Sequence, residues 1–135
     1  MKRINPYLTF AGNCREALDF YKTCFNGEIV SIETFGEANF AQNESMKDKI
    51  IHAEFKAEEI YFMASDAMPD FKANPGNMLT MSLSLSDKNE QAKIFDALAD
   101  GGTVTMPLDI AFWGEIFGMV TDRFGIHWML SCPTQ

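Results

Sequence analysis

The sequence predicts an α+β fold made of two βαβββ modules, and three observations point to it. Short matches recur at an offset of 75 residues, so that Leu8-Thr9-Phe10 returns as Leu83-Ser84-Leu85. The order strand, helix and three strands, inferred from apolar periodicity, occurs once in each half. Modules of about 65 residues bury little core alone, so we expect the strands to combine into one curved eight-stranded mixed sheet with the helices outside.

The first module is expected at about residues 1–66. A strand over 4–10 precedes a helix, for which Asn13 and Glu16 are a candidate capping box and Asn26-Gly27 the end. The apolar positions with helical spacing are Cys14, Ala17, Leu18, Tyr21, Cys24 and Phe25. Three strands follow, over residues 28–35, 50–56 and 60–64.

The second module is expected at about 78–135, after a linker over 67–77 that is rich in Pro, Asn and Gly. A strand over 78–85 precedes a helix that begins after Asp87 and ends at Asp100-Gly101-Gly102. Its expected buried positions are Ala92, Phe95, Leu98 and Ala99. Three strands follow, over 103–111, 116–121 and 126–131. We expect both modules to form a single domain over residues 1–135.

Composition excludes several classes of function. The 135 residues include 11 basic and 19 acidic side chains, and the net charge of −8 repels a nucleic-acid backbone. No apolar run approaches the roughly 20 residues of a membrane span. Three cysteines without a CxxC spacing are typical of reduced thiols. We therefore expect a cytoplasmic protein that binds neither nucleic acid nor membrane.

Several segments of this sequence resemble the vicinal-oxygen-chelate superfamily, and most closely its PhnB-like branch, often labelled 3-demethylubiquinone methyltransferase-like. The segments are Pro6-Tyr7-Leu8-Thr9-Phe10, His52-Ala53-Glu54-Phe55, Met63-Ala64-Ser65-Asp66-Ala67, Ile94 to Val104 and, most specific, Trp113 to Trp128. The resemblance covers essentially the whole chain. It implies the glyoxalase/bleomycin-resistance fold and a homodimer, without implying one particular reaction.

Metal-dependent enzymes of that superfamily hold a divalent ion with His and Glu side chains from the first and last strand of each module. The matching positions here are Asn5, Thr80 (or Met81), Phe62 and Trp128. These residue types are not a ligand set for such an ion, so we expect no metal and no cofactor.

His52, Glu54 and His127 are the remaining candidates for chemistry. His52 and Glu54 are two residues apart on a strand and share a face, whereas His127 is expected to point away from the face of Trp128. These residues are either a metal-free acid–base pair, non-standard metal ligands of a lyase or dioxygenase, or an ordinary polar strand face. Whether the protein is an enzyme therefore stays open, with His52 and Glu54 as the candidate catalytic residues.

The favoured hypothesis is a small-molecule-binding protein whose ligand lies on the concave sheet face. The expected ligand-binding residues are Asn5, Tyr7, Phe62, Thr80, Ser82, Trp113, Phe117 and Trp128. Phe62 and Trp128 would form the floor of an aromatic cup with a few hydroxyl groups, a composition typical of ligand pockets. The alternative is that the aromatic side chains only fill the interior.

The remaining acidic residues and cysteines are weaker candidates for a functional site. Asp66 and Glu115 are expected to be solvated, and the cysteines are expected to be core thiols. Methyl transfer is disfavoured because a nucleotide-like donor usually rests on a Gly-rich turn that opens a helix, whereas Gly101-Gly102 follows one.

Overall fold

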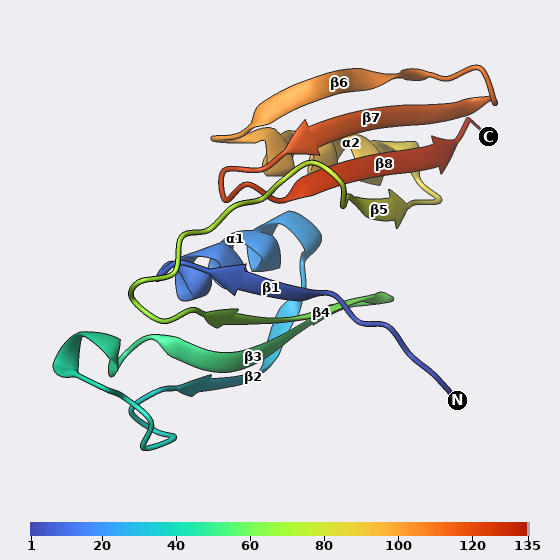
Figure 1. The fold of residues 1–135 in the computed structure, drawn as a ribbon. Coiled ribbons are helices and arrows are strands. Elements are labelled where there is room, and N and C mark those ends of the chain that lie inside the picture. The colour runs from blue at the N-terminus through green and yellow to red at the C-terminus, as the bar shows by residue number, and fades with distance from the viewer. Residues whose placement is uncertain (135) are drawn as a thin grey trace. The chain divides into compact units, whose positions relative to one another are not determined.

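The computed structural model describes residues 1–134, which divide into two compact units at Asn74–Pro75, inside the predicted linker. Each unit contains a four-stranded mixed sheet and one longer helix (Figure 1). The predicted α+β class and its two βαβββ modules are therefore confirmed, with the eight strands divided equally between two sheets.

The first unit follows the predicted order. Its elements are β1 (Tyr7–Phe10), α1 (Cys14–Phe25), β2 (Glu28–Thr34), the short 3-10 helix η1 (Glu44–Met46), β3 (Ile50–Ala57) and β4 (Ile60–Asp66). The strands lie in the order β1-β4-β3-β2, with β1 parallel to β4 and the other neighbours antiparallel.

The second unit repeats this arrangement. Its elements are β5 (Met81–Ser84), α2 (Lys88–Ala99), β6 (Thr103–Ile110), β7 (Glu115–Thr121) and β8 (His127–Pro133). The strands lie in the order β5-β8-β7-β6, and β5 is parallel to β8. Within residues 1–134, no helix combines the length and apolar character that a membrane span requires.

Helix α1 covers one face of the first sheet. All six apolar residues predicted for its buried stripe are buried. Its Phe25 ring lies 6.2 Å from Phe55 of β3, which in turn stacks on Phe62 of β4 at 4.9 Å. Aromatic pairs of this kind add about 0.5–1.5 kcal/mol beyond their buried area. The first core is therefore an aromatic stack between helix and sheet.

Helix α2 covers one face of the second sheet. Of its four predicted buried residues, Phe95 and Leu98 are buried, Ala99 is half-buried and Ala92 is not buried. Asp87 caps the helix as expected, accepting hydrogen bonds from the backbone of Asn89 and Glu90. The buried residue of the first turns, however, is Gln91, whereas Ala92 is exposed. The Gln91 amide donates to the Ile116 carbonyl oxygen at 2.9 Å, which satisfies a polar group that apolar periodicity alone would place in solvent.

Asp66 is a buried structural carboxylate, so the expectation that it is solvated is wrong. It is 4% exposed and accepts hydrogen bonds from the backbone N–H groups of Cys14 and Ile50, both at 2.9 Å. The side chain of Asn13 makes no capping hydrogen bond. A carboxylate from the end of β4 therefore serves the start of α1 in place of the predicted capping box.

Candidate functional site

Each sheet has one face covered by its helix and one open face. In β4, the buried residues Phe62 and Ala64 alternate with the half-buried Tyr61 and Met63. The first set packs toward α1, so the second set lies on the open face. Tyr7 pairs with Met63 and is exposed, so it lies on that open face.

Phe62 lies on the opposite, helix-covered face. Its ring makes an edge contact with Tyr21 of α1, with 5.5 Å between centroids, and its side chain is 0% exposed. The expectation that Phe62 forms the floor of the open face is therefore wrong. Its neighbours Tyr61 and Met63 are the residues of β4 that lie on that face.

The expectation that Trp128 forms the floor of the open face is wrong in the same way, in the second unit. Trp128 is 1% exposed, alternates with the half-buried His127 and Met129, and donates from Nε1 to Asp122 at 2.8 Å. Asp122 also accepts backbone hydrogen bonds from the Phe124–Ile126 turn. Trp128 is thus a core residue, and it is His127 that faces the open side.

The open face of the first sheet brings His52 and Glu54 together with two tyrosines. The Tyr7 hydroxyl lies 3.1 Å from Nδ1 of His52, and the Tyr61 hydroxyl donates to Glu54 at 2.5 Å. The hydrogen bond to Glu54, with smaller effects of desolvation and of the carboxylate charge, raises the pKa of Tyr61 above its usual value. At neutral pH this face therefore presents a protonated tyrosine bound to a carboxylate, beside a tyrosine–histidine pair.

The remaining predicted residues lie near strand ends or on the second sheet. Asn5 and Thr80 are half-buried and precede β1 and β5, and Ser82 is exposed beside Met129 of β8. Trp113 and Phe117 belong to a separate feature.

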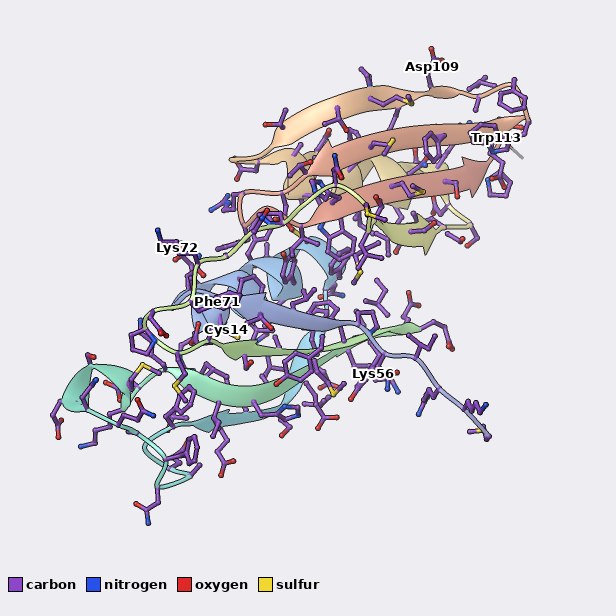
Figure 2. All side chains as sticks on the ribbon, viewed as in Figure 1. Cys14, Lys56, Phe71, Lys72, Asp109 and Trp113 are labelled. Atoms are coloured by element: carbon purple, nitrogen blue, oxygen red, sulfur yellow. The ribbon has the colours of Figure 1, made fainter. Side chains whose placement is uncertain are left out.

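That feature is a cavity of about 550 Å³ in the second unit, beside β6 and the hairpin that joins β6 to β7. It is lined by Met106, Pro107, Leu108, Asp109, Ile110, Ala111, Phe112, Trp113 and Phe117. Trp113 is 48% exposed, so the cavity is open to solvent. Figure 2 shows Trp113 where β6 turns into β7, and Asp109 along β6.

A tight turn fixes the aromatic residues of this hairpin. The Gly114 N–H donates to the Ala111 carbonyl at 2.9 Å, and Gly114 adopts a φ of 92°, which favours glycine. Phe112 and Trp113 are the two central residues of the turn. The Trp113 ring lies 4.9 Å from Phe112 at 88° and 5.3 Å from Phe117 at 70°. The hairpin therefore presents three rings that meet at steep angles.

Acidic groups accompany these rings. Glu115 is the first residue of β7. Its carboxylate accepts a hydrogen bond from the Trp113 indole Nε1 at 3.3 Å, so this carboxylate lies close to the hairpin. Asp109 lies opposite Phe117 in the β6–β7 pairing and accepts a hydrogen bond from the Ile110 N–H at 2.8 Å. Sequence patterns gave no sign of Asp109, because one acidic residue in an apolar strand resembles an ordinary solvated position.

A superfamily-type metal does not fit the side chains present. Among residues 1–134 no group of three His, Cys, Asp or Glu side chains is placed to hold an ion. His127 has Nδ1 at 2.9 Å from the Thr121 hydroxyl and Nε2 at 2.7 Å from the Gly76 carbonyl oxygen, so hydrogen bonds engage both ring nitrogens. The described side chains therefore do not form a metal site of the superfamily type.

Comparisons with known proteins agree with the fold. Protein PA1353 from Pseudomonas aeruginosa is 40% identical over 98% of both chains, with a TM-score of 0.86. The PhnB protein from Bacillus cereus is 28% identical over 97% of this chain and 99% of its own, with a TM-score of 0.79. The fosfomycin resistance protein FosX from Listeria monocytogenes shares the fold at 10% identity, over 98% and 94% of the two chains, with a TM-score of 0.69.

A family model described as 3-demethylubiquinone-9 3-methyltransferase matches residues 2–131. Its description names a reaction, yet Gly101 and Gly102 join the end of α2 to β6 and so do not open a helix toward a nucleotide-like donor. The match therefore shows the family of this chain and does not show that the chain catalyses the named reaction. The chain belongs to this PhnB-like, 3-demethylubiquinone methyltransferase-like family and has the glyoxalase/bleomycin-resistance fold.

Proposed function

We propose that this protein binds a small organic molecule in the cavity beside the β6–β7 hairpin, without a family-type metal. The observation that carries the proposal is the cavity itself, whose volume of about 550 Å³ falls within the range of ligand pockets. Its walls are mainly apolar and include Trp113 and Phe117, two of the residues expected to bind a ligand.

The exposure of the hairpin supports the same conclusion. Phe112 is 98% exposed at the centre of a hydrogen-bonded turn. Burying an aromatic side chain stabilises a protein by roughly 1.5–3 kcal/mol, a gain that Phe112 forgoes in the isolated chain. A bound molecule that covers Phe112 and Trp113 recovers part of this free energy.

The two tryptophans of the chain allow a direct test. In an amide correlation spectrum of 15N-labelled protein, the indole N–H signals of Trp113 and Trp128 are two separate reporters. Titration with benzyl alcohol, an uncharged aromatic probe, is expected to shift the Trp113 signal and to leave Trp128, which is buried against Asp122, unchanged.

Variants locate the binding. Saturation transfer to benzyl alcohol is expected to disappear in Trp113→Ala and to persist in Phe71→Ala, which removes another exposed aromatic side chain, in the first unit. Equal saturation transfer in wild type and Trp113→Ala would place binding elsewhere and overturn the proposal, as would the absence of transfer in the wild type.

We also propose that the protein is a homodimer. Met78 and Leu79 are large apolar residues in the segment before β5, and both are almost fully exposed, as expected of a surface that a second copy covers. Sedimentation equilibrium is expected to give twice the chain mass of 15.2 kDa, and Leu79→Lys is expected to give the monomer mass. A wild-type monomer would refute the dimer.

We propose that the protein is cytoplasmic, because three cysteines, an odd number without a CxxC spacing, are typical of proteins kept in a reducing compartment. Fractionation of cells that produce the untagged protein tests this location. Recovery from an oxidising compartment would contradict it.

A further inference from the structure

We propose that the ligand class is a cation whose charge is surrounded by apolar groups, such as a quaternary or N-methylated ammonium compound. The inference rests on the proposed function, because it names the chemistry of the molecule that the cavity binds.

The arrangement of the rings is the first argument. Trp113 meets Phe112 at 88° and Phe117 at 70°, with centroids 4.9 and 5.3 Å away. Rings at such angles form the walls of a corner instead of a single stack. The face of an aromatic ring is the negative end of its quadrupole, and cages of such faces recognise alkylated ammonium groups.

Charge is the second argument. The described residues that line the cavity include the acidic residue Asp109 and no Lys, Arg or His. A second carboxylate, Glu115, accepts the Trp113 indole N–H at 3.3 Å and so lies at the edge of the ring cluster. An anionic ligand would meet repulsion here without a basic partner, whereas a cation gains from both carboxylates.

The lining has few polar side chains, and this favours one kind of cation over another. Most lining side chains are aliphatic or aromatic, as with Met106, Leu108 and Ile110. A primary ammonium group prefers hydrogen-bond acceptors, and among the lining side chains only Asp109 is a carboxylate. A quaternary or methylated ammonium group needs fewer hydrogen bonds and presents methyl groups to the apolar walls, so it fits this lining better.

Three probes of nearly the same shape separate charge from shape. Choline is the cation, 3,3-dimethylbutan-1-ol is its uncharged analogue, and 3,3-dimethylbutanoate is the anion. Titrations followed by the Trp113 indole signal are expected to give choline roughly ten-fold tighter binding than the alcohol, equivalent to about 1.4 kcal/mol, with the anion weakest.

Two variants test the parts of the site. Asp109→Asn is expected to weaken choline about three-fold and to leave the alcohol unchanged, because it removes only charge. The matched control Asp96→Asn, on the exposed side of α2, is expected to change neither affinity. Phe112→Leu keeps apolar contact but removes a ring face, so it is expected to weaken choline more than the alcohol.

The outcomes distinguish this inference from the proposed function. If choline and the alcohol bind equally well, the cation class is wrong while small-molecule binding stands. If 3,3-dimethylbutanoate binds best, the charge argument is wrong. If none of these probes, and not benzyl alcohol either, shifts the Trp113 signal, both proposals are overturned.

Discussion

Replacing Asp66 by Asn tests whether one buried carboxylate organises the first unit. Asp66 accepts the backbone N–H groups of Cys14 and Ile50, each at 2.9 Å, and so joins the start of α1 to the start of β3. Asparagine has nearly the same shape but only one acceptor oxygen. One of the two backbone groups would therefore face an NH₂ group that cannot accept its hydrogen bond.

The expected cost follows from these contacts. A hydrogen bond to a charged group contributes roughly 1.5–3 kcal/mol, and a buried unpaired N–H group costs a further 1–3 kcal/mol in unfavourable cases. The surviving bond also loses its charge assistance. We expect Asp66→Asn to lower the free energy of unfolding by about 3 kcal/mol, a large share of the roughly 5–15 kcal/mol of a typical domain.

Urea denaturation followed by circular dichroism measures this loss. With a slope of about 1.5 kcal/mol per molar urea, the midpoint is expected to fall by about 2 M. Asp70→Asn, an exposed position in the segment after β4, is the matched control and is expected to change the midpoint little. A loss below about 0.5 kcal/mol in Asp66→Asn would refute the role assigned to this carboxylate.

Two further changes test the cores. Burial, with a smaller effect of the Asp66 charge, raises the pKa of the Cys14 thiol from 9.0 to about 12. The thiol's contribution to stability is therefore present below pH 9 and lost as the pH rises toward 12. In urea titrations from pH 8 to 11, Cys14→Ala is expected to lose less stability than the wild type, by at most about 3 kcal/mol. Identical slopes for the two proteins would contradict this. Gly118→Ala would place a Cβ 2.8 Å from side-chain atoms of Phe95 and Leu108, so we expect a loss of about 1–3 kcal/mol in the same assay, and an unchanged midpoint would show that the core adapts freely.

Helical periodicity identified α1 and its buried stripe correctly, because six apolar residues at the right spacing leave only one face for the core. The second helix was harder, since Gln91 and Ala92 are adjacent and hydrophobicity favours the alanine. Only the carbonyl of Ile116, on a strand 25 residues away, makes the glutamine the buried residue. A long-range hydrogen bond of this kind leaves no mark on local periodicity.

The two faces of the last strands were assigned the wrong way round. Strand alternation gives two sets of residues but does not say which set the helix covers. In β8 the half-buried set contains the polar residues His127 and Ser131, whereas the buried set contains Trp128, Leu130 and Cys132. The presence of His and Ser in only one of the two sets is the signal that marks the open face. The predicted aromatic ligand cup therefore placed two core residues, Phe62 and Trp128, on the open face.

Trp113 and Phe117 were predicted to lie at the concave sheet face, beside a glycine turn in the most specific segment of the sequence, whereas in the structure they line a cavity beside the β6–β7 hairpin. The angles of the Trp113 ring to Phe112 and to Phe117, and the position of Asp109 across from Phe117, depend on the pairing of β6 with β7, which contains register shifts. Such irregular pairing is not encoded in a simple alternation pattern.

A crystal structure of the protein grown with benzyltrimethylammonium would test the proposed binding site. Electron density for the ligand is expected in the β6–β7 cavity, with its trimethylammonium group against the rings of Trp113 and Phe117 and on the side of Asp109. Density for the ligand on another surface, with this cavity empty, would contradict the proposed site.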